Sequence, residues 1–107
     1  METNLIKKQT IGYFLRPITW LSFYQHGWGN GYIALPIGHK YYGVYYDDIP
    51  VEVHGGLTFS EHWQDWMPEE FKGYWIIGFD TAHHRDNHTM EEVEKETQNL
   101  LNQLINL

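Results

Sequence analysis

The chain has 107 residues and a formal net charge of −7, from 14 acidic and 7 basic residues with histidine neutral. We expect one domain over residues 1–107, because this length suffices for a single packed core and no linker interrupts it. The acidic excess argues against a nucleic-acid duplex as partner, and the lack of cysteine excludes disulfides, thiolate metal sites and thiol nucleophiles. The chain has no apolar run of signal-peptide or membrane-span length, so we expect a cytoplasmic protein without a membrane partner.

Aromatic residues are unusually frequent, with five Trp, eight Tyr and five Phe. One small core cannot hide all of these rings, so some are expected in a ligand cleft or in the subunit interface of a homo-oligomer. One group could stack a base or sugar ring, or pack in such an interface: Tyr41, Tyr42, Tyr45 and Tyr46, with Trp28.

The first half of the chain predicts short strands between turns. Residues 10–23 are apolar and aromatic, and indicate a strand broken at Pro17 or a short helix that begins there. The three glycines within residues 25–31 predict a turn with positive φ angles. Residues 32–35 then predict a strand, which is an edge strand or ends at Pro36, and a tyrosine-rich loop follows.

Residues 51–60 alternate between apolar and polar or small side chains, as a half-buried strand does, and the same parity recurs at Trp75, Ile77 and Phe79. The expected core faces carry Val51, Val53, Leu57 and Phe59 in one strand and Trp75, Ile77 and Phe79 in the other. If the two strands are neighbours in a sheet, His54 and Asp80 share the opposite face. Both segments run into titratable groups, so we expect their polar ends to meet at a site.

Two further elements complete the predicted fold. Residues 60–71 indicate a short helix or an ordered loop whose aromatic side chains form a wall over the site. Thr89 and Glu92 form a capping-box pattern, and apolar residues then recur at helical spacing to about Asn106. The fold class is therefore α+β, an antiparallel sheet of four or five strands with a C-terminal helix packed across one face.

The sequence His54-Gly55-Gly56 is the sharper of two candidate motifs. Two glycines allow close approach of a ligand and can point backbone amides at an anion, while an imidazole can bind an oxyanion or a metal or act as a base. Thr58 lies on the same predicted face. The alternative is a bulge at a sheet edge with an exposed histidine.

A second group of imidazoles and carboxylates follows the 75–79 strand: Asp80, His83, His84, Asp86 and His88. With His54, the residues Asp80 and His83 would form a three-ligand site for zinc, manganese or iron. The spacing matches no established metal motif, so a polar loop before a helix is an alternative. In a metal-free pocket, Asp80 would orient an imidazole and Arg85 would bind an anion. We expect Asp86 to cap the turn into the last helix and assign no site role to His84 or His88.

These segments resemble a group of small uncharacterised proteins encoded by bacteriophages and prophages. In that group, Val-His-Gly-Gly-Leu-Thr precedes Gly-Phe-Asp-x-Ala-His and a closing acidic helix, as residues 53–58 and 78–83 do here. The resemblance covers about residues 30–105, and the chain departs from the pattern at His84 and Arg85, where the group has small residues. It implies a phage or prophage origin, hence the host cytoplasm, and directs attention to His54, Asp80 and His83.

Small phage proteins often act against host defence by sequestering a nucleotide signal or blocking a host protein. We therefore expect a protein that binds or sequesters a small anionic or nucleotide-like ligand through His54, Gly55, Gly56, Thr58, Asp80 and His83. Two alternatives remain open. One is a metal-dependent hydrolase that uses the same cluster with a divalent ion such as zinc, and the other is a protein-interaction module.

Overall fold

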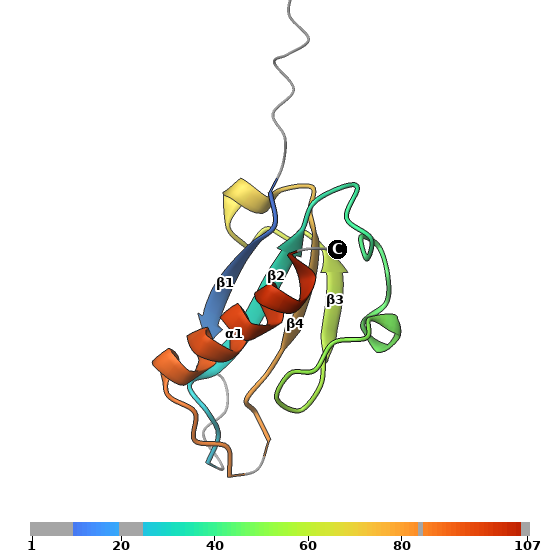
Figure 1. Cartoon of the computed structure of the whole chain (residues 1–107). Coiled ribbons are helices and arrows are strands. Elements are labelled where there is room, and N and C mark those ends of the chain that lie inside the picture. Colours follow the sequence, from blue (N-terminus) through green and yellow to red (C-terminus); the bar gives the residue numbers. More distant parts are fainter. Residues whose placement is uncertain (1–9, 20–24, 84, 106–107) are drawn as a thin grey trace, which may run out of the picture.

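The computed structural model of the chain describes residues 10–19, 25–83 and 85–105. They form a four-stranded antiparallel sheet crossed by one α-helix (Figure 1). The strands are β1 (Gly12–Pro17), β2 (Gly29–Leu35), β3 (Phe59–His62) and β4 (Trp75–Phe79), and the helix is α1 (Met90–Leu104). Two short 3-10 helices, η2 (Tyr46–Asp48) and η3 (Glu69–Phe71), lie in the connections. The predicted α+β class is confirmed.

The strand order is β1-β2-β4-β3, so β4 lies between two strands that precede it in the chain. β1 pairs with β2, and β3 pairs with β4, each as an antiparallel hairpin. The two hairpins join where β2 pairs with β4, with Ile33 opposite Ile77. The polar chain segments that precede β3 and follow β4 therefore meet at one end of the sheet (Figure 1).

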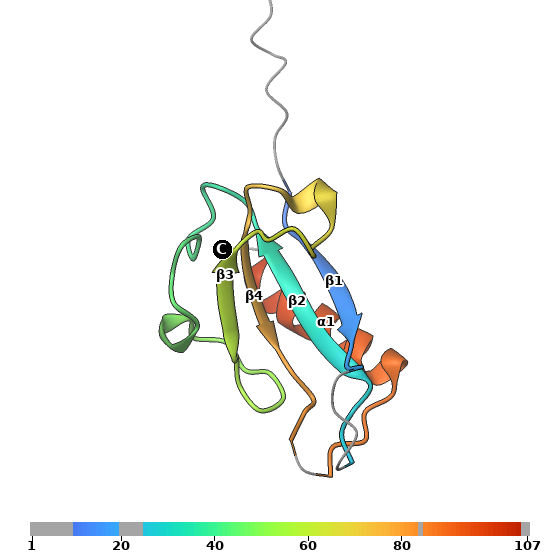
Figure 2. The same ribbon diagram turned by 180° about the vertical axis from the view of Figure 1, so that it is seen from behind.

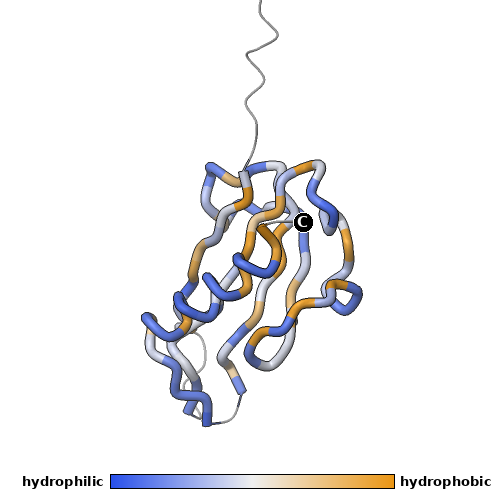
Figure 3. Tube along the Cα trace, viewed as in Figure 1, coloured by the Kyte–Doolittle hydropathy of each residue, from blue (hydrophilic) through white to orange (hydrophobic). Residues whose placement is uncertain are grey.

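The helix covers one face of the sheet. It begins with the predicted capping box, in which Thr89 accepts from the Glu92 backbone and Glu92 accepts from the Thr89 backbone. Its apolar side chains, spaced along one face, pack on the sheet, and the change between hydrophobic and hydrophilic residues can be followed in Figure 3. The core on this side contains Ile33, Leu35, Ile49, Ile77, Phe79, Val93, Leu100 and Leu104. The predicted helix end at Asn106 lies outside the described residues.

A second hydrophobic cluster lies on the opposite face of the sheet, which the connection between β3 and β4 crosses (Figure 2). The segment between β3 and β4 carries Met67 and Phe71 onto the sheet, where they pack against Tyr32, Ala34, Tyr74 and Ile76. Phe14 of β1 stacks on Tyr32 with ring centroids 4.9 Å apart. The aromatic residues between β3 and β4 therefore form a second core layer and not the predicted wall over the histidine site.

The predicted strand over residues 51–60 is wrong for most of its length, because β3 begins only at Phe59. Gly55 and Gly56 both have positive φ angles, +69° and +78°, and the Gly56 amide donates to the Val53 carbonyl. This turn changes which face of the sheet the following side chains point to. Val51, Val53 and Leu57 pack on the helix-side core as predicted, whereas Phe59 packs on the opposite face.

The N-terminal strand prediction is confirmed for β1, which ends at Pro17, while residues 20–23 lie outside the described part. The predicted turn at 25–31 is shorter, because β2 already begins at Gly29. None of the glycines 27, 29 and 31 has a positive φ angle. They instead allow close approach: a β-carbon on Gly31 would collide with the Thr97 hydroxyl of α1 and with the Phe79 ring.

Candidate functional site

The segment that leads to His54 is tied to the helix by side chains of α1. The Gln103 side chain accepts a hydrogen bond from the Glu52 amide at 2.8 Å and donates one to the Glu52 carbonyl at 2.7 Å. The Glu96 carboxylate accepts from the His54 amide at 2.7 Å. The helix therefore supplies the hydrogen bonds that a neighbouring strand would otherwise supply, and these hold His54 beside α1.

The turn after His54 is shaped to receive the imidazole of His83. A β-carbon on Gly55 would lie 2.5 Å from His83 Cε1, whereas one on Gly56 would meet nothing within 4 Å. Glycine is thus required at position 55 for two reasons, its positive φ angle and its contact with the ring. The Gly56 amide is already used within the turn, so it is not available to an anion.

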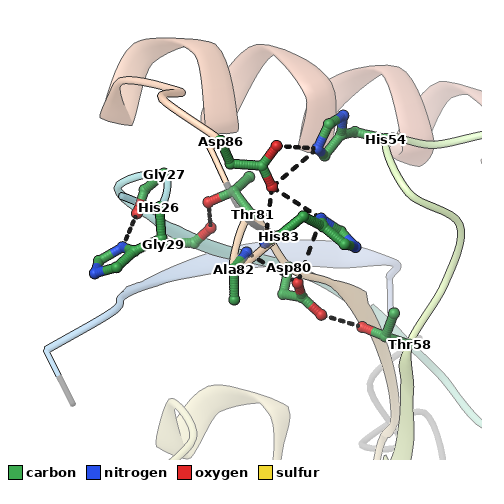
Figure 4. Close-up of polar contacts among 10 residues, drawn as sticks. All are labelled: His26, Gly27, Gly29, His54, Thr58, Asp80, Thr81, Ala82, His83 and Asp86. Carbon is green, nitrogen blue, oxygen red and sulfur yellow. Dashed lines mark hydrogen bonds and ion pairs between the residues drawn. The ribbon is translucent and has the colours of Figure 1, made fainter. Parts of the chain in front are cut away.

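The Asp86 carboxylate is the centre of the site (Figure 4). Its Oδ1 lies 3.2 Å from His54 Nε2, and its Oδ2 lies 2.8 Å from His83 Nδ1 and accepts the His83 amide at 3.0 Å. The side chain is only 12% exposed. Burial by itself raises the pKa of Asp86, but the hydrogen bonds from His83 and His54 outweigh it, and the pKa lies below its ordinary value. Asp86 is therefore an anion shared by two imidazoles.

A reversal of the chain at Arg85 brings Asp86 back to His83. Arg85 has a positive φ angle of 71°, unusual for a residue other than glycine, and its amide donates to the Gln25 carbonyl at 3.0 Å. The Asp86 amide donates to the His83 carbonyl at 2.9 Å, which closes the turn. Nothing in the structure tests the predicted anion-binding role of the Arg85 side chain.

Asp80 lies on the other side of His83. Its Oδ1 accepts the Ala82 amide at 3.0 Å and lies 3.8 Å from His83 Nδ1, while its Oδ2 accepts from the Thr58 hydroxyl at 2.9 Å (Figure 4). The His54 ring lies 5.4 Å from the His83 ring between centroids, so the structure brings together five of the predicted site residues: His54, Gly55, Thr58, Asp80 and His83.

His88 completes a group with His54 and Asp86. The rings of His54 and His88 are 4.2 Å apart between centroids, and the three residues each place one potential ligand atom within 4.8 Å of the others. His88 Nδ1 is buried and has no hydrogen-bond partner among the described residues. Two ligands of a tetrahedral zinc ion lie about 3.3 Å apart, close to the 3.2 Å between His54 Nε2 and Asp86 Oδ1. The three side chains therefore lie close enough together to serve as ligands of one metal ion.

This ligand set differs from the predicted set of His54, Asp80 and His83. The hydrogen-bond partner of the His54 imidazole is Asp86 rather than Asp80, because His54 lies in a turn and not in a strand beside β4. Asp86 was expected to cap the turn into the last helix, and its carboxylate does accept the His83 amide within that turn, but it also contacts both imidazoles. His84 lies outside the described residues. The sequence signal that could have identified Asp86 and His88 is their position. Both are potential metal ligands in the loop between the end of β4 and the capping box of α1.

A groove borders the three donors on the α1 side. It has a volume of about 570 Å³ and is lined by His54, His88, Glu92, Lys95, Glu96 and Asn99. Both glutamates already accept backbone hydrogen bonds, Glu92 from Thr89 and Glu96 from His54. A ligand in this groove would meet the imidazoles at one end and the helix side chains along its wall.

The predicted tyrosine group is dispersed. Tyr41 and Trp28 pack against the helix-side core, and Tyr42 donates to the Gly73 carbonyl at 2.9 Å. Tyr45, which is 53% exposed, contacts Tyr46, with ring centroids 4.4 Å apart and ring planes tilted by 34°. A homo-oligomer interface that uses these rings stays a prediction.

No protein-family model, curated protein or solved structure matches this chain. The phage or prophage origin implied by the sequence resemblance therefore stays a prediction. Within the described residues, no helix has the length and apolar character needed to cross a membrane.

Proposed function

We propose that the protein binds a divalent transition-metal ion, zinc in the first instance, through His54, Asp86 and His88. The observation that carries this proposal is the convergence of two imidazoles and one carboxylate within 4.8 Å. Imidazole and carboxylate ligands suit zinc, iron and manganese, and the chain has no cysteine that would favour a thiolate site. If Nδ1 is the ligand atom of the half-buried His88 side chain, metal binding would also give this buried nitrogen a partner.

The surroundings of Asp86 support the same assignment. His83 holds Asp86 Oδ2 through its ring and its amide, and in this position both carboxylate oxygens face His54 Nε2, at 3.2 and 3.3 Å. Such outer hydrogen bonds orient metal-binding carboxylates in proteins. In this arrangement His83 and Asp80, which were predicted as metal ligands, would instead help to position the metal ligand Asp86.

Three protein ligands leave at least one coordination position of a zinc ion open. The groove beside His54 and His88 would give a small molecule access to that position. The proposed function is therefore metal-assisted binding of a small ligand. Metal-assisted hydrolysis would use the same open position, and a role against host defence stays a prediction from the resemblance.

Zinc binding should be measured by isothermal titration calorimetry and native mass spectrometry on tag-free protein. We expect one zinc ion per chain, and expect His54→Ala, Asp86→Asn and His88→Ala each to weaken zinc binding by at least tenfold. His62→Ala is the matched control, because His62 lies on β3 and contacts the Trp75 ring. Equal zinc affinity in the His62 and His88 variants, or no zinc retained by the parent protein, would refute the proposal and favour an interaction module.

A further inference from the structure

The groove beside the proposed metal site contains two polar side chains that the fold does not use. Lys95 and Asn99 lie one turn apart on α1, and both are exposed. Neither side chain makes a hydrogen bond or ion pair with any described residue. The two groove glutamates, in contrast, are held by the backbone amides of Thr89 and His54. The groups open to a ligand are therefore an ammonium and an amide.

The charge of the site depends on the metal. Without an ion, Asp86, Glu92 and Glu96 exceed the single positive charge of Lys95. A divalent ion bound by Asp86 raises the sum of these charges from −2 to 0, and it places the positive charge of the ion at one end of the groove, with Lys95 on the wall beside it. Metal and lysine together would attract a negatively charged group, which the metal-free groove would repel.

We infer that the groove binds a small molecule through a terminal oxyanion, a carboxylate or a phosphate. The oxyanion would occupy the open position of the metal ion, and Lys95 and Asn99 would bind the groups next to it. A lysine serves phosphate and carboxylate alike as a compact point charge. The groove volume of about 570 Å³ lies within the usual range for small-molecule sites. This inference rests on the proposed metal site.

Cobalt-loaded protein allows the test, because the visible absorption of Co²⁺ changes when a new ligand enters its coordination shell. Inorganic phosphate and acetate are titrated separately into the cobalt-loaded protein, followed by its visible absorption, and into the metal-free protein, followed by isothermal titration calorimetry. We expect a saturable spectral change with at least one anion, and no anion binding by the metal-free protein. A response to phosphate alone would assign the site to phosphate esters, and a response to acetate alone would assign it to carboxylates.

Lys95→Gln should weaken anion binding by about fivefold, the upper end for an exposed ion pair, and should leave Co²⁺ affinity within about twofold. Lys72→Gln is the matched control, because it removes the same charge from the opposite face, where Lys72 lies 5.7 Å from the Trp63 ring centroid. Bound cobalt without a response to either anion, or equal anion affinity in the two lysine variants, would overturn the inference and leave the metal site standing. Absence of bound cobalt would overturn both.

Discussion

The imidazole of His83 lies directly against Gly55, so that a β-carbon at position 55 would come within 2.5 Å of the ring. The same ring donates to Asp86 at 2.8 Å. A residue of the turn before β3 therefore controls the position of the carboxylate after β4. The contact explains why a glycine and a histidine so far apart in sequence belong to one site.

Gly55→Ala should lower the free energy of unfolding by about 2–4 kcal/mol, because alanine disfavours a positive φ angle and its methyl group displaces His83 from Asp86. Urea denaturation provides the measurement. Gly56→Ala is the control, since its φ angle is also positive but the added methyl group meets nothing, and it should cost about 1–2 kcal/mol. In a His83→Ala background the two glycine variants should cost the same. A persistent difference there would show that the ring is not responsible.

Gly31→Ala should be among the most destabilising small substitutions in the sheet, at about 2–4 kcal/mol, because the new methyl group collides with Thr97 and Phe79 where α1 crosses β2. Thermal and urea unfolding of the purified variant would measure this loss. The cost of Gly31→Ala should fall in a Thr97→Ala background, which removes one of the two colliding groups. An unchanged cost would place the strain on Phe79 alone.

Gln103→Ala should cost about 1 kcal/mol of stability, because it removes both hydrogen bonds to Glu52. It should also weaken zinc binding, since the segment that carries His54 loses its attachment to α1. Gln98→Ala is the control on the same helix, because the Gln98 side chain donates to the Tyr13 hydroxyl and, among the described residues, makes no hydrogen bond to the segment that carries His54. Calorimetric zinc titrations of both variants check the prediction, which fails if they lose equal affinity.

The capping box predicts a pH dependence of stability below neutrality. The hydrogen bond from the Thr89 amide holds the pKa of Glu92 below its ordinary value, so the folded state favours the charged carboxylate. Its contribution is fully present above the unfolded pKa of about 4.3, and is lost as the pH falls through the lower folded value. The stability difference between the parent and Glu92→Gln should therefore shrink in this range. Glu91→Gln, which removes a charge from the same helical turn, should not reproduce that change.

The helix and the central strands could be predicted because their signals are local. The Thr89 capping box and the spacing of the apolar residues of α1 can be recognised from residues close together in the sequence. The same holds for the apolar strand β4, which is followed directly by Asp80. The prediction of a strand over residues 51–60 was wrong because it assumed that the alternation of apolar and polar residues continues across Gly55 and Gly56, where the chain turns. An extended loop that packs Val51 and Val53 on a core has the same period as a strand.

The composition of the site could be predicted only in part, for a related reason. His54, Asp80 and His83 follow from their places at the ends of strand-like segments. The positions of Asp86 and His88 depend on how the loop after His83 folds back. Two tertiary hydrogen bonds determine that path: the Arg85 amide donates to the Gln25 carbonyl, and the Trp28 amide donates to the His88 carbonyl. The sequence of the loop alone does not identify these hydrogen-bond partners.

The placement of β4 between β2 and β3 has a consequence for the order of folding. Each hairpin can form from nearby residues, whereas the β2–β4 pairing joins segments distant in the chain, so we expect it to form after both hairpins. The proposed ligands His54 and His88 flank the second hairpin, and they are held by α1 and by Trp28 just before β2. Metal affinity should therefore develop only in the last folding step, when the hairpins dock, which makes zinc uptake a kinetic probe of that step.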